Sequence, residues 1–181
     1  MVVPAHDTEV GAMAVNPEGT LIASASARGH IIKIYSTDGG EVVQELKRGN
    51  SKAEITQIVF HPTQYLLACT SSKSSIHLFE IKKAVETCIN TRQYGFSNND
   101  LTKNVDGKNT KSGMSFMKVL NKYWDSDLCL TKIKVNEKFK QIGFDVKNNR
   151  LAIVTNERSI YFVDLPKEQT RYIEEAECRF F

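Results

Sequence analysis

An internal repeat constrains the fold of this chain more than any other feature of its sequence. Three segments align with one another: Met13–Ser36, Ile58–Ile81 and Ile142–Leu165. The second and third align without a gap at an offset of 84 residues, and the first matches the second at an offset of 45 with one extra residue near Ile32. A period near 45 residues with several short strands per unit is typical of the blades of a β-propeller.

Each unit has the same order of strands and turns. A short apolar strand leads through a polar turn to a second apolar strand, which is LIASAS, LLACTS or LAIVTN. Another turn leads to an alternating strand, which is IIKIY, IHLFEI or IYFVDL. Strands this short and this regularly spaced predict an all-β fold. Fourth strands are predicted at Glu41–Leu46, Leu128–Val135 and Thr170–Cys178.

The predicted organisation is a partial β-propeller over residues 1–181. Its three four-stranded blades span about 9–49, 53–135 and 139–181. The middle blade contains an insertion over 82–122, which we interpret as a long loop that is either functional or disordered. Three blades do not close a propeller, since closed propellers typically have 4–8 blades. Either a longer chain supplies the other blades or this piece pairs with another copy, because open blade faces would expose apolar surface.

Composition and charge exclude several classes of protein. The formal net charge is only +3, which does not indicate a nucleic-acid-binding face. No apolar run reaches the roughly 20 residues of a membrane-spanning helix, and the first residues lack the pattern of a secretion signal. The cysteines are far apart and form no CxxC pair, so reduced thiols and no metal site are predicted for Cys69, Cys88, Cys129 and Cys178.

The stretch from Ala5 to Phe79 resembles the PROPPIN family, the seven-bladed WD-repeat-like propellers that bind polyphosphoinositides and include the WIPI proteins. The resemblance is carried by Ala5-His6, VNPEGTLIASASARGHIIKIYSTDGG, ELKRG at Glu45–Gly49 and AEITQIVFHPTQYLLACTSSKSSIHLF. LNKYWDSDL at Leu120–Leu128 and the ending EAECRFF resemble later parts of the family pattern, and the ending is expected to be a natural C-terminus. The resemblance implies that the three units are blades five, six and seven.

The resemblance also implies a function. It implies a cytoplasmic adaptor that is recruited peripherally to autophagosomal or endolysosomal membranes. The implied ligands are phosphatidylinositol 3-phosphate, the 3,5-bisphosphate or both, and the implied partners are autophagy or trafficking proteins, with no cofactor. The family has two head-group sites on the rim, on either side of the paired arginines of an FRRG motif. Lys47 and Arg48 stand at those two positions here.

Lys47 and Arg48 directly follow the strand predicted at Glu41–Leu46, and if they continue it, their side chains point to opposite sides and favour two adjacent pockets. A phosphorylated inositol is a compact polyanion that suits forked guanidinium donors, together with hydroxyl and imidazole donors. The positions that match the family's first pocket are His6, Ser24, Ser26, His30, Lys33 and Lys47. The positions that match its second pocket are Arg48, Thr70, Ser71, Ser75 and His77.

The first pocket departs from the family pattern. Lys47 and Lys33 stand where the family has arginine, and His30 replaces a threonine. A lysine does not form the two-pronged contact of a guanidinium, so we expect this pocket to be weakened or altered. The second pocket keeps its guanidinium, hydroxyls and imidazole. Partial protonation of His77 in mildly acidic solution is expected to favour anion binding there.

The insertion over 82–122 corresponds to the loop with which the family touches membranes. It holds eight Lys and Arg against three Asp and Glu. Each basic residue near an anionic leaflet contributes about 1 kcal/mol. The side chains that are candidates for shallow insertion into lipid are Tyr94, Phe96, Phe116 and Met117.

Other interpretations of these residues stay open at this point. Lys47 and Arg48 can be ordinary charges at a strand end, the serines and histidines can satisfy turns and hydrogen bonds, and the insertion can be a solvated loop. No nucleophile elbow, phosphate-binding loop or zinc-protease motif occurs, so no catalytic residue is predicted. The alternative function is a scaffold for protein–protein interaction without lipid binding, since propellers host many functions.

Overall fold

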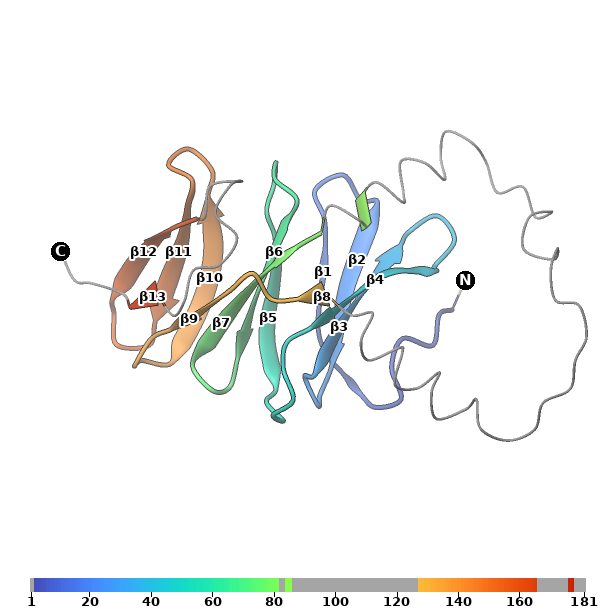
Figure 1. The fold of residues 1–181 in the computed structure, drawn as a ribbon, viewed down its shortest axis with the longest axis horizontal. Helices are drawn as coiled ribbons and strands as arrows, with labels where there is room; N and C mark the ends of the chain where they lie inside the picture. Colours follow the sequence, from blue (N-terminus) through green and yellow to red (C-terminus); the bar gives the residue numbers. More distant parts are fainter. Residues whose placement is uncertain (1, 82–83, 86–126, 166–175, 178–181) are drawn as a thin grey trace, which may run out of the picture.

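The structure is a computed structural model that describes residues 2–81, 84–85, 127–165 and 176–177. These residues form three β-sheets, which lie side by side along the long axis of the molecule (Figure 1). Within this part of the chain, no helix has the length and apolar character needed to cross a membrane. The four side chains predicted to touch lipid, Tyr94, Phe96, Phe116 and Met117, lie outside the described residues, as do Cys88 and Cys178.

The first sheet contains the first repeat unit. Its antiparallel strands are β1 (Val10–Val15), β2 (Leu21–Ser26), β3 (Ile31–Ser36) and β4 (Val42–Lys47). The two-residue strand β8 (Asp127–Leu128) pairs in parallel with the outer edge of β4. The chain therefore returns to the first sheet after the insertion, before it completes the second.

The second sheet contains the second repeat unit. Its strands β5 (Ile55–Phe60), β6 (Leu66–Ser71) and β7 (Ser75–Glu80) are antiparallel, and β9 (Thr131–Lys134) joins the edge of β7. The strand predicted at Leu128–Val135 is thus the fourth strand of this sheet.

The third sheet consists of β10 (Phe139–Asp145), β11 (Arg150–Thr155) and β12 (Ile160–Asp164). The fourth strand predicted for this unit at Thr170–Cys178 is described only at β13 (Ala176–Glu177), which pairs in parallel with β9 of the second sheet instead of with β12. A pairing with β9 is available because β7 occupies only one edge of that strand.

The three sheets share one backbone irregularity, a break in strand register at the same place in each repeat unit. The first strand of each sheet breaks register with the second strand, after Val10, Ile55 and Phe139. Such a bulge bends a strand and increases its twist, so the three sheets share one shape. The extra residue of the first unit lies in the β2–β3 turn at 27–30, one residue longer than the β6–β7 turn at 72–74.

The middle sheet is buried on both of its faces. Leu67 and Cys69 of β6 belong to the apolar core shared with the first sheet, whereas Leu66 and Ala68 belong to the core shared with the third. This alternation follows from the two-residue period of a strand. The first strands β1, β5 and β10 contact one another in that order, as the innermost strands of neighbouring blades do (Figure 1). The predicted all-β partial propeller is confirmed.

The two outer sheets carry apolar side chains on their free faces. Met13 and Val15 of β1 are 61% and 51% exposed, and Ile160 and Phe162 of β12 are 60% and 56% exposed. In a closed propeller a neighbouring blade covers such faces. The three sheets therefore have the surfaces of an incomplete ring.

A glutamine of β5 holds the second sheet to the third. Gln57 Nε2 donates to the Ile142 carbonyl at 3.1 Å, and Gln57 Oε1 accepts from the Ile142 N–H at 2.8 Å. We expect Gln57→Leu to lower the free energy of unfolding by about 1–3 kcal/mol, because both backbone groups lose their partner. The control is Gln64→Leu, whose amide donates to Asn149 on the surface and should matter by less than about 0.5 kcal/mol. Equal urea midpoints for the two variants would contradict this role.

Candidate functional site

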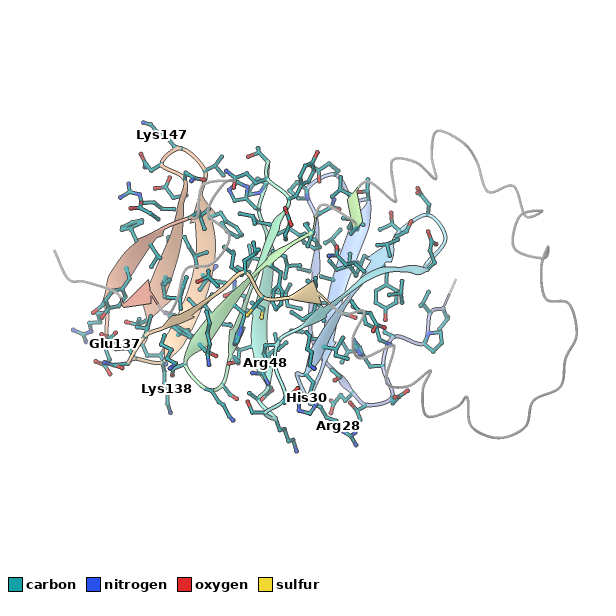
Figure 2. All side chains as sticks on the ribbon, in the orientation of Figure 1. Arg28, His30, Arg48, Glu137, Lys138 and Lys147 are labelled. Atoms are coloured by element: carbon teal, nitrogen blue, oxygen red, sulfur yellow. The ribbon has the colours of Figure 1, made fainter. Side chains whose placement is uncertain are left out.

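The predicted site residues lie at one end of the strands of the first two sheets. Figure 2 shows Arg28, His30 and Arg48 at this end, and Lys147 at the opposite end. We call this end the basic edge. Glu9 and Glu54 also lie there, where their carbonyl groups accept hydrogen bonds from Ala27 and Ser72. The lysines and arginines of the basic edge are Arg28, Lys47, Arg48, Lys52, Lys73, Lys132 and Lys134.

Arg48 is the only buried lysine or arginine among the described residues, with 6% of its surface exposed. It directly follows β4, and the alternation along that strand directs it toward the second sheet, as it does Leu46. Its backbone N–H donates to the His30 carbonyl at 2.9 Å. Its guanidinium donates to the carbonyl oxygens of Gly29 and Ser51. Arg48 therefore ties the β2–β3 turn to the segment that leads into the second sheet.

Three of the predicted second-pocket residues form a hydrogen-bonded chain. Ser71 Oγ lies 2.9 Å from Ser75 Oγ, and Ser75 Oγ lies 3.2 Å from His77 Nε2. The pairing of β6 with β7 brings them together, because Ser71 stands opposite Ser75 and Cys69 stands opposite His77. All three polar side chains are buried. In the part of the chain that the structure describes, His77 Nδ1 has no hydrogen-bond partner.

The charge of Arg48 acts on this hydroxyl–imidazole chain. Burial, together with the positive charges of Arg48 and Lys132, lowers the pKa of His77 to about 4. Burial raises the pKa of Cys69, on the same face of the sheet, to about 12, and the Arg48 charge opposes that rise. The described residues give Arg48 no hydrogen bond to Ser75 or His77, so the guanidinium and the chain are near but separately held.

The low pKa of His77 corrects the expectation that this ring is partly protonated in mildly acidic solution. A ring with a pKa of about 4 is neutral in mildly acidic solution, so acidification to pH 5 or 6 does not protonate His77 in the ligand-free protein. The physical reason is that burial and two nearby cations both disfavour a third positive charge.

Thr70 does not join the other second-pocket residues. It stands opposite Ile76, which packs in the core between the second and third sheets. Its Oγ1 shares a hydrogen bond of 2.7 Å with Thr56 Oγ1. Neighbouring residues of a strand point to opposite faces, so Thr70 and Ser71 face away from each other.

Most of the residues matched to the first pocket lie on the face of the first sheet that points away from the second sheet. Ser24 and Lys33 stand directly opposite each other on β2 and β3. His6 Nε2 lies 2.9 Å from Ser24 Oγ, and burial, with the Lys33 charge, lowers the pKa of His6. The Ala5 carbonyl accepts from Lys33 Nζ at 3.0 Å and from the Tyr35 hydroxyl at 2.8 Å. The N-terminal segment thus lies over this face.

The other three first-pocket residues divide between the two faces. Ser26 is two residues from Ser24, and Lys47 is two residues from Glu45, which stands opposite Lys33. Both side chains therefore lie on the same face as Ser24. His30 lies in the turn at 27–30, and its carbonyl accepts from the N–H of the neighbouring Arg48. Burial, then the charges of Arg48, Arg28 and Lys52, lowers the pKa of His30. His30 accordingly belongs with the second set of residues, not with the first.

Three cations near the site were not predicted from the sequence. Lys132 stands opposite His77 on β9, and Arg28 and Lys52 act on His30. Lys132 had a usable signal, since the predicted fourth strand of the second unit must pair with the strand that carries His77. Arg28 and Lys52 lie in irregular segments, for which strand periodicity gives no position.

His77 should make the folded protein sensitive to acid. A histidine in an unfolded chain has a pKa of about 6.5, so the unfolded state binds the proton first as the pH falls. Stability is complete above about pH 6.5 and is lost as the pH falls toward the folded pKa of about 4. We expect His77 to lower the free energy of unfolding by about 2 kcal/mol between neutral pH and pH 5. Urea unfolding of His77→Gln at pH 7.5 and pH 5 measures this.

The contribution of His77 to the acid sensitivity can be separated from that of the other histidines. The pKa values of His6, His30 and His61 are also lowered, each mainly by burial, so the variant keeps part of the acid sensitivity. The loss between the two pH values should nevertheless be clearly smaller than in the parent chain. An unchanged loss would show that His77 is not held neutral by the fold.

Comparison with known proteins identifies relatives of this chain. A PROPPIN family model matches residues 1–98. Autophagy-related protein 21 of Schizosaccharomyces pombe is 45% identical over 78 residues, which cover 43% of this chain and 23% of that protein. SVP1-like protein 2 of Emericella nidulans is 34% identical over 113 residues, covering 62% of this chain and 33% of that protein. The chain therefore spans a third or less of the length of these relatives.

Solved structures share its fold. Hsv2p of Kluyveromyces lactis superposes with a TM-score of 0.56 at 23% identity, over 86% of this chain and 41% of that one. KlAtg21, solved in complex with the coiled coil of AgAtg16, gives a TM-score of 0.59 at 22% identity, over 90% of this chain and 39% of that one. The family model covers more than half of the chain and includes every residue of the two candidate pockets. The chain belongs to the PROPPIN family.

Proposed function

We propose that this chain binds phosphatidylinositol 3-phosphate, phosphatidylinositol 3,5-bisphosphate or both through its basic edge. In this proposal it is a non-enzymatic adaptor of the cytoplasm, recruited peripherally to autophagosomal or endolysosomal membranes. The observation that carries the proposal is the position of the Arg48 charge beside the buried chain of Ser71, Ser75 and His77. Family membership supports it, because both pockets fall within the matched residues.

The second pocket has the chemistry of an anion site. Arg48 supplies a permanent positive charge, and its guanidinium can give charge-assisted hydrogen bonds to phosphate oxygens. The Ser71 and Ser75 hydroxyls can rotate to donate, and His77 Nδ1 is a buried polar atom without a partner in the described residues. A bound phosphate would raise the pKa of His77, since an adjacent anion favours the charged ring. Lys132 would add a second cation from β9.

The first pocket is the weaker of the two in this proposal. Lys33 already donates to the Ala5 carbonyl, and His6 is hydrogen-bonded to Ser24. Lys33 and Lys47 bring charge without the forked geometry of arginine. We therefore assign the main head-group contact to the second pocket and a supporting, electrostatic contribution to the first.

The insertion over 82–122 would provide a third contact. Its eight basic residues would attract an anionic leaflet, and Tyr94, Phe96, Phe116 and Met117 would enter it shallowly. Several weak contacts on one surface raise the overall affinity, because each later contact forms at a high effective concentration.

Co-sedimentation with liposomes tests the proposal. The chain is mixed with phosphatidylcholine vesicles that contain phosphatidylinositol 3-phosphate, phosphatidylinositol 3,5-bisphosphate, phosphatidylinositol or no added lipid. We expect the chain to pellet with the two 3-phosphorylated lipids and to stay in solution with the other two. Equal pelleting with all four compositions would contradict the proposal and would favour the protein-interaction scaffold.

An adaptor also requires protein partners. The solved complex of KlAtg21 with the coiled coil of AgAtg16 concerns a protein of the same fold, and we propose that the partners of this chain are likewise autophagy or trafficking proteins. The lipid and protein functions are compatible, because the basic edge uses only one end of the strands of the first two sheets.

A further inference from the structure

A cavity of about 280 Å³ lies between the first two sheets, at the end of the strands opposite the basic edge. Its walls come from the β1–β2 turn at 16–20 and the β5–β6 turn at 61–65. Its apolar lining includes Phe60, Ile81 and Val85. These turns and the turns of the basic edge join opposite ends of the same strands, so the cavity is separate from the candidate lipid site.

His61 begins the β5–β6 turn that lines the cavity, and its ring faces the third sheet, as does the side chain of Leu66, whose carbonyl accepts from the His61 N–H. The His61 Nδ1 accepts hydrogen bonds from the N–H groups of Thr63 at 3.1 Å and Gln64 at 2.9 Å, so the neutral ring carries its proton on Nε2. In the described part of the chain, Nε2 has no hydrogen-bond partner, and the ring is only 4% exposed. The ring also lies edge to face with Phe144, which fixes its orientation. These contacts hold the β5–β6 turn that forms one wall of the cavity.

Glu18 makes one wall of the cavity acidic. Asn16 Nδ2 donates to Glu18 Oε2 at 2.9 Å, while Asn16 Oδ1 accepts from the N–H groups of Thr20 and Leu21, both at 2.8 Å. The buried Asn16 side chain therefore fixes the turn and orients the exposed carboxylate. A fixed carboxylate at the mouth of a cavity repels anions and attracts a cation.

The neighbouring turns at the same end are also acidic. Asp38 and Glu41 lie in the β3–β4 turn, and Glu80 ends β7. The described residues of these turns and of the two cavity turns contain no lysine or arginine. Lys82 and Lys83 come next in the chain and lie outside the described residues. On the first two sheets the described turns around the cavity are thus acidic, whereas the adjoining β10–β11 turn, whose Asn149 accepts from Gln64 of the cavity wall, carries Lys147 and is followed by Arg150.

We propose that this cavity binds a short basic segment of a protein partner. One apolar side chain of the segment would pack against Phe60, Ile81 and Val85, and a lysine or arginine would lie beside Glu18. The volume of about 280 Å³ is just below the roughly 300–1,000 Å³ of pockets that hold small molecules, so the cavity suits a single side chain of a partner. The lipid and the peptide would bind at opposite ends of the strands.

The test uses the whole 181-residue chain and no lipid, so its result does not depend on the proposed lipid function. The probes are arrays of labelled eight-residue peptides with one central apolar residue between two lysines, and a matched array with glutamates in place of the lysines. We expect saturable binding to lysine peptides and none to glutamate peptides. We expect Glu18→Gln and Val85→Asp each to weaken binding at least tenfold.

The control variant is Glu157→Gln, which removes an exposed carboxylate from the β11–β12 turn and should bind like the parent chain. Thermal unfolding by circular dichroism shows that each variant is folded. Three results would overturn the proposal: no binding to any lysine peptide, equal binding to both arrays, or binding that Glu18→Gln leaves unchanged. A loss of self-association in Glu18→Gln, seen by sedimentation, would instead assign the cavity to a second copy of the chain.

Discussion

Replacement of Gly29 by alanine should lower the free energy of unfolding by about 3–5 kcal/mol, because a left-handed backbone and a backbone clash act together. Gly29 has a φ of +64°, and a Cβ atom there would lie 1.8 Å from the Ala53 carbonyl oxygen. That oxygen belongs to backbone, so relief requires the β2–β3 turn and the segment entering the second sheet to move apart. The same movement would loosen the contact of Arg48 with the Gly29 carbonyl.

Gly19 offers a matched control for this prediction. Its φ is +67°, and a Cβ atom there would meet no heavy atom within 4 Å. Gly19→Ala therefore carries only the backbone penalty of about 1–2 kcal/mol. Urea unfolding of the two variants under identical conditions separates the clash from the backbone term. Equal stabilities would mean that Gly29 is not tightly packed against Ala53.

Replacement of Arg48 by alanine should reduce binding to vesicles with phosphatidylinositol 3-phosphate by about 10- to 100-fold, since charge-assisted hydrogen bonds contribute about 1.5–3 kcal/mol. Lys47→Ala removes the same charge from the adjacent position and should cost distinctly less. Lys47 lies on the other face of β4, away from Ser75 and His77. Equilibrium co-sedimentation over a series of lipid concentrations measures both affinities.

Arg48 also stabilises the fold, so a second variant is needed to separate a loss of binding from a loss of folding. Circular dichroism and urea unfolding show whether Arg48→Ala remains folded without its contacts to Gly29 and Ser51. Ser75→Ala removes the central hydroxyl of the buried chain without touching these contacts, and it should also weaken vesicle binding. If both Arg48→Ala and Ser75→Ala bind as tightly as the parent chain, the second pocket does not hold the head group.

The strands of this protein could be predicted from its sequence because each unit repeats one pattern of apolar residues. LIASAS and LLACTS became β2 and β6, with Leu67 and Cys69 facing one core and Leu66 and Ala68 the other. The two-residue period decides both the existence of such strands and the direction of their side chains. The same period separates Thr70 from Ser71, which matching positions to a family pattern did not take into account.

The partners of Arg48 could not be predicted in the same way. The extra residue in the turn at 27–30 and the irregular segment after Arg48 have no strand period. Their approach depends on the packing of the first sheet against the second. Consequently the sequence indicated a cation at this position, but not its contacts with the Gly29 and Ser51 carbonyls. The pairing of β13 with β9 likewise depends on which sheet edge is open in three dimensions.

A titration with the soluble head group, inositol 1,3-bisphosphate, followed by NMR of the histidine rings tests the central claim most directly. In the ligand-free chain the His77 ring should titrate near pH 4. Saturation with the head group should shift the His77 resonances and move that pKa upward, while the His61 ring at the opposite end of the strands stays unchanged. Binding that leaves the His77 resonances and its pKa where they were would contradict the claim that Arg48, Ser75 and His77 hold a phosphorylated inositol.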